Sequence, residues 1–353
     1  MSTANDASPE IKIIATCMVV VTAIASGFTL AYLKPVLAPF TLAVLFVLAL
    51  NPFVDLLENR AKLPHPVAVG VTLLVAALLL VGTGGIISAT VANLANNADV
   101  YQEQIARQVT AAQAWAPRFD ALAEVDTEDA KKAMLEGPLA ALNGIFTGFV
   151  GGMFNLLSNG FLILIFTLFL LLGQAVRSGP SDGVRGEALK SIQSYLLLKT
   201  AISVGTGLLH GIILWTLGVK FPFVFGMLAA LLNFIPNFGP VIAVIAPAPL
   251  FPLSPEITLL TGTLALVLPA ALHFASGNLV EPRLIGASLD LSPVAVLLSL
   301  IFFGMIWGVI GMFLATPLTA ALKIALQQNE YTAPAAALLA GRVDEAFGGG
   351  GKS

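Results

Sequence analysis

The chain has 353 residues, of which 57% are hydrophobic and only 10% are charged, with a formal net charge of −3. A soluble domain carries roughly 25% charged residues, so this composition predicts an integral membrane protein. The charge balance gives no reason to expect a nucleic-acid partner, the single cysteine excludes an internal disulfide framework, and three widely separated histidines show no metal-ligand spacing. Because the sequence has no phosphate-binding loop or hydrolase motif, we expect no cofactor and no enzyme.

Apolar runs long enough to cross the hydrocarbon core, which needs about 20 residues, recur along the chain. Acidic charge before the first run argues against a signal peptide, so we expect a retained helix there. The last run, of roughly 33 residues, would reach about 50 Å as one helix, and we expect it to tilt, protrude or break at a glycine or at Pro317. The sequence thus predicts an all-α integral membrane protein with seven to eight transmembrane helices. The runs are 13–33, 36–50, 67–92, 145–172, 201–218, 223–250, 257–277 and 293–325.

Lysine and arginine near the ends of these runs indicate the orientation of the chain. The loops 51–66 and 173–200 carry several cations, whereas the loops on the opposite side carry one each: Lys34, Lys220 and Arg283. This pattern places both termini in the cytoplasm. Eight crossings satisfy that arrangement, and seven would require one segment to re-enter the membrane.

The distribution of polar residues predicts five segments. They are N-terminal transmembrane helices (1–91), an extracytoplasmic amphipathic helical segment (92–143), a fourth transmembrane helix with a cytoplasmic linker (144–200), a C-terminal transmembrane core (201–327) and a flexible cytoplasmic tail (328–353). The second segment holds eight carboxylates against four cations. Either it extends the neighbouring helices beyond the bilayer, or it is a docking arm for a partner or substrate.

The stretch LLNFIPNFGPVIAVIAPAPLFPLSPEI, residues 231–257, is apolar but rich in proline. Proline removes a backbone donor and breaks a helix, and broken backbone at membrane depth persists only beside protein or water. Transporters use such breaks to present half-helix ends to a solute. Asn233 and Asn237 are suited to cap half-helices around Pro236 and Pro240. The alternative is an ordinary turn between two short helices outside the hydrocarbon core.

A second polar constellation is HFASGNLVEPRLIGASLDLSP, residues 273–293, between two strongly apolar runs. Charges at the bilayer centre are costly, by about 2.5–3.5 kcal/mol on insertion scales. Glu281 and Arg283 flank Pro282, and residues two apart do not share a helix face. We therefore expect extended or turn backbone here, with the two charges neutralising each other or neighbouring helices. The segment 278–290 is either re-entrant or an exposed loop with a surface ion pair.

Small residues at four-residue intervals allow membrane helices to approach closely, within one subunit or between subunits. We expect Lys199, just before the fifth run, to snorkel to the interface. His210 lies well inside that run, where it is either a buried, hydrogen-bonded histidine or a proton-carrying group. The glycine series are Gly144, Gly148 and Gly152, then Gly207 and Gly211, then Gly304 and Gly308.

Several motifs, in order, resemble the autoinducer-2 exporter (AI-2E) family, and most closely its quorum-signal transport protein branch. They are ALNPFVDLLENR, SIQSYLLLKTAISVGTGLLHGIILWTLGV, LLNFIPNFGPVIA and NLVEPRLIGASLDLSPVAVLLSLIFFGMIWGVIGMFLATPLTAALKI. The resemblance covers residues 35–60 and 191–325. The charged linker after the fourth run is short and glycine-rich in this chain, which departs from the family pattern.

The resemblance implies a bacterial inner-membrane protein with multiple spans that exports the furanone signal autoinducer-2. Other members are described as sodium(lithium)/proton antiporters, and the family as pentameric, so a homo-oligomer is implied. The signatures carried over to this chain are Asn233, Pro236, Asn237, Gly239, Pro240, Glu281, Pro282, Arg283, Gly286 and Pro317.

Three functions follow as hypotheses. The first is a transporter of a small polar solute, a quorum-sensing signal, with broken elements near 233–240 and 278–290 lining its path. The second is a sodium(lithium)/proton antiporter on the same scaffold, and the third is a membrane scaffold or pore that does not transport. The expected partners are a small-molecule or ion substrate and the lipid bilayer. The candidates for proton coupling are Glu281, Asp290, His210 and His273. The predicted path residues are Asn233, Pro236, Asn237, Gly239, Pro240, Asn278, Glu281, Pro282, Arg283 and Gly286.

Overall fold

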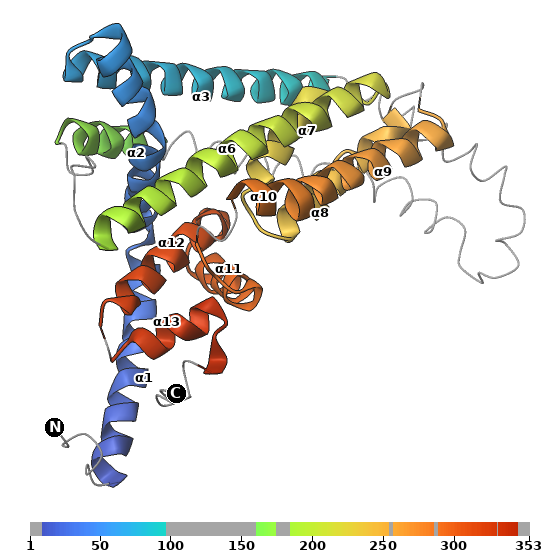
Figure 1. Cartoon of the computed structure of the whole chain (residues 1–353). Helices are drawn as coiled ribbons and strands as arrows, with labels where there is room; N and C mark the ends of the chain where they lie inside the picture. Colours follow the sequence, from blue (N-terminus) through green and yellow to red (C-terminus); the bar gives the residue numbers. More distant parts are fainter. Residues whose placement is uncertain are drawn as a thin grey trace, which may run out of the picture. The chain divides into compact units, whose positions relative to one another are not determined.

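The computed structural model describes residues 9–96, 160–173, 184–253, 257–285, 289–329 and 331–344. All elements in these ranges are helices, which confirms the predicted class. The chain divides into two compact units, one formed by Met1–Leu45 with Leu291–Ser353 and the other by Phe46–Asp290. Figure 1 labels their helices. Five described helices are long and apolar enough to cross a membrane: Lys34–Ala61, His65–Ile86, Leu189–Thr216, Leu259–Ile285 and Val309–Gln327.

The first unit contains helices from both ends of the chain: α1 (Pro9–Tyr32), the start of α2 (Lys34–Ala61), α11 (Pro293–Trp307), α12 (Val309–Gln327) and α13 (Ala333–Ala340). The indole Nε1 of Trp307 donates to the Leu30 carbonyl at 3.0 Å, which ties the end of α11 to α1.

The last predicted run is broken, as its length suggested. It forms α11 and α12, which meet at Gly308, where φ is +67° and ψ is −143°. This backbone conformation is open mainly to glycine. Pro317 lies inside α12 and does not end it.

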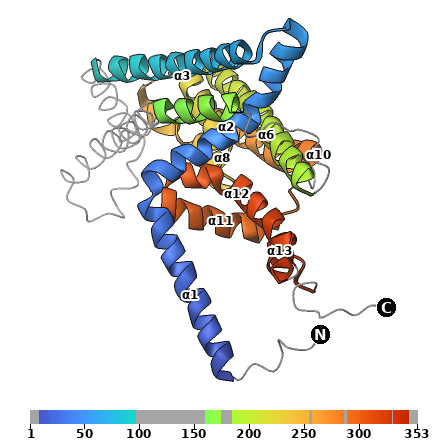
Figure 2. The same cartoon turned by 90° about the vertical axis from the view of Figure 1, so that its left-hand side faces the viewer.

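The tail beyond 328 contains a short helix, α13. An alanine-rich sequence with proline in the first turn and Gly341 after the last turn favours such a short helix. The backbone N–H of Ser292 donates to the Leu339 carbonyl at 2.9 Å and holds α13 beside the start of α11. Figure 2 shows α11, α12 and α13 in the red part of the colour scale.

The second unit holds the rest of α2, then α3 (His65–Asn96), a helix over Gly160–Leu172, α6 (Val184–Thr216), α7 (Pro222–Leu232) and α8 (Phe238–Ile245). After these come a 3-10 turn η1 (Ala248–Leu253), α9 (Leu259–Ala275), the π-helical turn η2 (Ser276–Val280) and α10 (Glu281–Ile285).

The expected loop 51–66 is wrong, because α2 continues to Ala61. The expected start of the fifth span at 201 is also wrong, because α6 begins at Val184. The amphipathic segment 92–143 lies outside the described residues beyond Asn96, as does the glycine series at 144–152.

The predicted break near 233–240 is present. Instead of one span over 223–250, α7 ends at Leu232 and α8 begins at Phe238. Asn237 precedes α8 with φ +63°, and neither it nor Asn233 caps a helix with its side chain as expected. A Cβ at Gly239 would lie 1.8 Å from the Leu232 carbonyl oxygen, so this tight reversal requires glycine.

The expected extended or turn backbone around Pro282 is wrong. The helix begun by α9 continues through η2 into α10, so Glu281, Pro282 and Arg283 are all helical. A proline ring clashes with the carbonyl four residues earlier in a regular α-helix. The π-helical turn just before Pro282 shifts the hydrogen bonds to the i→i+5 pattern, as in the bond from the Glu281 N–H to the Ser276 carbonyl, and so accommodates the ring.

Glycines bring α6 and α7 into close contact, as the four-residue spacing indicated. A Cβ at Gly207 would lie 2.4 Å from the Gly226 carbonyl oxygen, and one at Gly226 would lie 2.5 Å from the Gly207 carbonyl oxygen. Beyond this contact, a hydrophobic cluster including Leu214, Phe225 and Leu250 joins α6, α7 and η1. The two helices therefore pack backbone to backbone, and α7 positions the break that follows it.

We predict that Gly207→Ala destabilises the protein by about 1–3 kcal/mol, the usual cost of overpacking a tight contact. The matched control is Gly205→Ala on the same helix, where an added Cβ meets nothing within 4 Å. Because alanine favours a helix by up to about 1 kcal/mol over glycine, this control should be neutral or stabilising. Thermal unfolding of the two purified variants in detergent measures the difference, and equal midpoints would contradict the packing argument.

Candidate functional site

One face of α6 carries polar side chains through the more apolar part of the helix, after its polar first turns. Lys199, Ser203, Thr206 and His210 follow one another at intervals of four, three and four residues, which places them on one face. All four are buried, and Lys199 is only 5% exposed. At 1.5 Å per residue they extend over roughly 16 Å, about half of a ~30 Å hydrocarbon core.

The helix through α9, η2 and α10 presents a matching set: His273, Ser276 and Glu281. Residues five apart, such as Ser276 and Glu281, point in different directions on an α-helix, since they are roughly 1.4 turns apart. The wider π turn of η2 lies between them and brings them closer to one face. The π turn thus has two effects: it accommodates Pro282, and it brings Ser276 and Glu281 closer to one face of the helix.

The two sets pair in antiparallel order and form what we call the polar ladder. The Lys199 Nζ lies 2.6 Å from the Glu281 Oε1. The hydroxyls of Thr206 and Ser276 share a hydrogen bond of 2.9 Å. The Nδ1 of His210 lies 3.2 Å from the Nε2 of His273.

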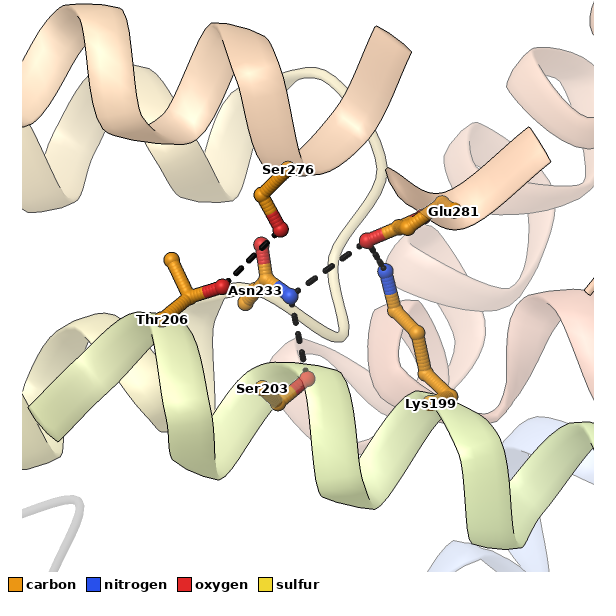
Figure 3. Close-up of polar contacts among 6 residues, drawn as sticks. All are labelled: Lys199, Ser203, Thr206, Asn233, Ser276 and Glu281. Carbon is orange, nitrogen blue, oxygen red and sulfur yellow. Dashed lines mark hydrogen bonds and ion pairs between the residues drawn. The ribbon is translucent and has the colours of Figure 1, made fainter. Parts of the chain in front are cut away.

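The broken helix contributes to the ladder through Asn233, which ends α7 and is 3% exposed. Its Nδ2 donates to the Ser203 Oγ at 3.0 Å and to the Glu281 Oε1 at 3.4 Å. Figure 3 shows the Asn233 side chain between α6 and the helix that carries Glu281. Asn233 therefore links three segments that are distant in sequence.

The ladder contains one close pair of charged groups, Lys199 and Glu281, whose opposite charges compensate each other. The Lys199 and Glu281 side chains are 6% and 22% exposed. Removing such groups from water is costly unless each has a partner of opposite charge and further hydrogen bonds. Glu281 has both, because Oε1 accepts from Lys199 and from Asn233.

The sequence profile described as "AI-2E family transporter" matches residues 13–330 of the chain. The chain belongs to the AI-2E transporter family. It is therefore a multi-pass membrane protein of a family of transporters.

Individual relatives agree with this assignment. The AI-2 transport protein TqsA of Escherichia coli (strain K12) is 33% identical over 308 residues, which cover 83% of this chain and 86% of the relative. A protein of the same strain named "Putative transport protein YhhT" is 28% identical over 319 residues, which cover 86% of this chain and 88% of the relative.

Of the predicted path residues of this AI-2E protein, the structure brings Asn233 and Glu281 together and places others apart from the ladder. Asn278 is exposed, and its amide donates to the Phe274 carbonyl at 3.0 Å. Arg283 is also exposed and does not pair with Glu281, which pairs with Lys199 instead.

The remaining predicted residues have supporting positions or lie outside the description. Pro236 and Gly239 shape the reversal between α7 and α8, Pro240 lies in the first turn of α8, and Asn237 is exposed. Asp290 is partly buried with φ +45°, and Gly286 lies outside the described residues. His210 and His273, predicted as separate candidates for proton coupling, contact each other.

Sequence reasoning missed Lys199, Ser203, Thr206 and Ser276. The signal for the first three was their helical spacing together with His210. It was overlooked because the span was expected to begin at 201, which left Lys199 outside it. Ser276 becomes recognisable only when α6 and α9 are known to be antiparallel neighbours.

We predict that Lys199→Met destabilises the protein by about 3–5 kcal/mol, because it leaves the Glu281 carboxylate without its cation. The double variant Lys199→Met with Glu281→Gln should recover most of this loss, since no unpaired charge remains. Lys190→Met, at an exposed position on the same helix, is the control and should change little. Unfolding midpoints of the three purified variants measure the effect, and a double variant no more stable than Lys199→Met would contradict it.

Proposed function

We propose that this AI-2E protein moves a small, uncharged polar solute of the AI-2 type across the bacterial inner membrane. The polar ladder is the observation that carries the proposal. Helices that only anchor a protein in lipid have no need of buried lysine, glutamate, asparagine and histidine, and such groups inside membrane segments usually mark a solute path. The ladder lies between two of the helices that are long enough to span the membrane, Leu189–Thr216 and Leu259–Ile285.

The choice of solute is supported by the relative TqsA, whose name describes an AI-2 transport protein. It also agrees with the charges of the ladder. A site for a charged solute would offer an excess of the opposite charge, whereas Lys199 and Glu281 compensate each other. The other ladder members are hydroxyl, amide and imidazole groups, which suit hydrogen bonding to a neutral solute.

The break between α7 and α8 contributes polar groups to the proposed path. Broken helices in transporters expose backbone groups that a continuous helix would use itself. Here the break carries Asn233, whose amide reaches both Ser203 and Glu281. On this proposal Asn233 exchanges these partners for groups of the solute, while the Lys199–Glu281 pair keeps the site electrically neutral.

The proposal includes the orientation and the assembly of the chain. The cations Arg60 and Lys62, with Arg177, Arg185 and Lys190 of the segment 173–200, support a cytoplasmic location of both termini. We further propose a homo-oligomer, in agreement with the pentamers that the family resemblance implies. Crosslinking in native membranes would test the assembly, and a purely monomeric product would contradict it.

We predict that Glu281→Gln lowers AI-2 flux into proteoliposomes by about tenfold or more. Loss of a charged hydrogen bond is worth about 1.5–3 kcal/mol, and each 1.4 kcal/mol corresponds to roughly tenfold. The matched control is Arg283→Gln, two residues further along α10 but exposed, which should retain flux. Glu281→Gln should lower the unfolding midpoint, because it leaves Lys199 without its partner, so flux is measured at a temperature at which both variants are folded and equally expressed.

The outcomes of this experiment separate the hypotheses. Normal flux in Glu281→Gln would remove Glu281 from the path. A wild-type protein that moves no AI-2 but exchanges sodium for protons in the same vesicles would favour the antiporter hypothesis. Wild-type vesicles inactive in both assays would favour a scaffold.

We also predict that water reaches the ladder, whose α6 members are buried in this structure, when the path opens to one side, and that solute protects it. After Cys17, the only cysteine, is replaced by serine, Ser203→Cys should react with a hydrophilic thiol reagent, and AI-2 should slow the reaction. The control is Val204→Cys, at the next residue, which is 50% exposed on another face of α6 and is expected to face lipid and react slowly. Equal labelling of both positions, unaffected by AI-2, would contradict the proposed path.

A further inference from the structure

The two histidines of the ladder form a pair whose hydrogen-bonding capacity is only half used. His210 is 0% and His273 is 4% exposed, and their ring centroids are 5.4 Å apart at an interplanar angle of 69°. The inner nitrogens, His210 Nδ1 and His273 Nε2, lie 3.2 Å apart. The outer nitrogens, His210 Nε2 and His273 Nδ1, are buried and have no hydrogen-bond partner.

The chemistry of imidazole determines what the outer nitrogens offer. A neutral ring has one N–H donor and one lone-pair acceptor. In the inner hydrogen bond one ring donates and the other accepts. The donating ring then has an outer acceptor, and the accepting ring has an outer donor. In either direction, therefore, the neutral pair presents one donor and one acceptor.

Buried polar atoms without partners are uncommon in folded proteins, and each one calls for an explanation. The other ladder members satisfy one another: Lys199 with Glu281, and Thr206 with Ser276. The two outer histidine nitrogens are the only buried side-chain nitrogen or oxygen atoms of the ladder that have no hydrogen-bond partner at all. A hydroxyl group, which both donates and accepts, complements such a pair, whereas a carboxylate or an ammonium complements only half of it.

We propose that His210 and His273 form a hydroxyl-binding subsite for an uncharged, polyhydroxylated solute. The subsite rests on the proposed transport function and specifies where on the ladder the solute is recognised. The solute's hydroxyls accept from one outer nitrogen and donate to the other. Thr206 and Ser276, the next ladder members, lie four and three residues away along their helices.

Histidine ring nitrogens labelled with ¹⁵N provide a direct test on the unaltered protein. The chain has three histidines, so the spectrum of the protein in lipid nanodiscs is simple. We expect AI-2 to shift the outer nitrogens of His210 and His273. His65 is the internal control, because its Nδ1 contacts Glu58 and its Nε2 lies 3.1 Å from the Leu171 carbonyl oxygen, so its signals should remain in place.

Each result has a defined meaning when AI-2 flux is measured on the same preparation. Flux with shifts confined to His210 and His273 supports the subsite. Flux without these shifts overturns the subsite but leaves the transport function intact. Absence of both flux and shifts overturns both proposals. If the ¹⁵N signals show that the rings of His210 and His273 are both protonated and do not respond to AI-2, the subsite is overturned in favour of a proton-carrying pair.

A kinetic comparison separates binding from structural support. His273→Phe keeps a ring but loses both nitrogens, and it should raise the KM for AI-2 about tenfold, the equivalent of 1.4 kcal/mol, with a smaller change in maximal rate. His65→Phe should leave the KM for AI-2 unchanged. A variant of His273 with the KM of the wild type would overturn the subsite.

Discussion

The ion pair between Lys199 and Glu281 is the interaction on which the arrangement of the second unit depends. Both side chains are largely removed from solvent, and an ammonium or carboxylate left alone there would be very unfavourable. The pair therefore fixes the register of α6 against α10. Once that register is set, Thr206 meets Ser276 and His210 meets His273 along the same antiparallel helices.

The close packing of α6 on α7 is the second constraint, and it supports the first. Because Gly207 and Gly226 have no side chains, the two backbones approach to contact distance. Asn233 at the end of α7 is then near enough to reach Ser203 on α6 and Glu281 on α10. A bulky residue in the glycine contact would move the break away from the ladder.

The sequence predicted much of this fold but only part of the ladder. Composition and apolar runs were sufficient for an all-helical membrane protein, proline and glycine indicated the break near 236, and a glycine was among the expected places for the break at 308. Asn233 and Glu281 stood out because a polar residue inside an apolar run is costly. Lys199 did not, because a lysine near the expected end of a span is normally explained by snorkelling. Its role depends on where α6 begins and on a partner 82 residues away, and apolar periodicity reports neither.

The two ends of the ladder differ in how far their polar groups are hydrogen-bonded. At the Lys199 end the polar groups satisfy one another, with a charge pair and the Asn233 amide. At the His210 end two nitrogens remain open. A group that already has a hydrogen-bond partner binds the solute only by giving up that partner, whereas an open group gains its first hydrogen bond when the solute arrives.

On the proposed function, solute binding is therefore most favourable at the histidine end, and passage toward Glu281 requires Asn233 to release its partners. The neutrality of the Lys199–Glu281 pair limits the electrostatic cost of that exchange, because no net charge is exposed to the apolar surroundings.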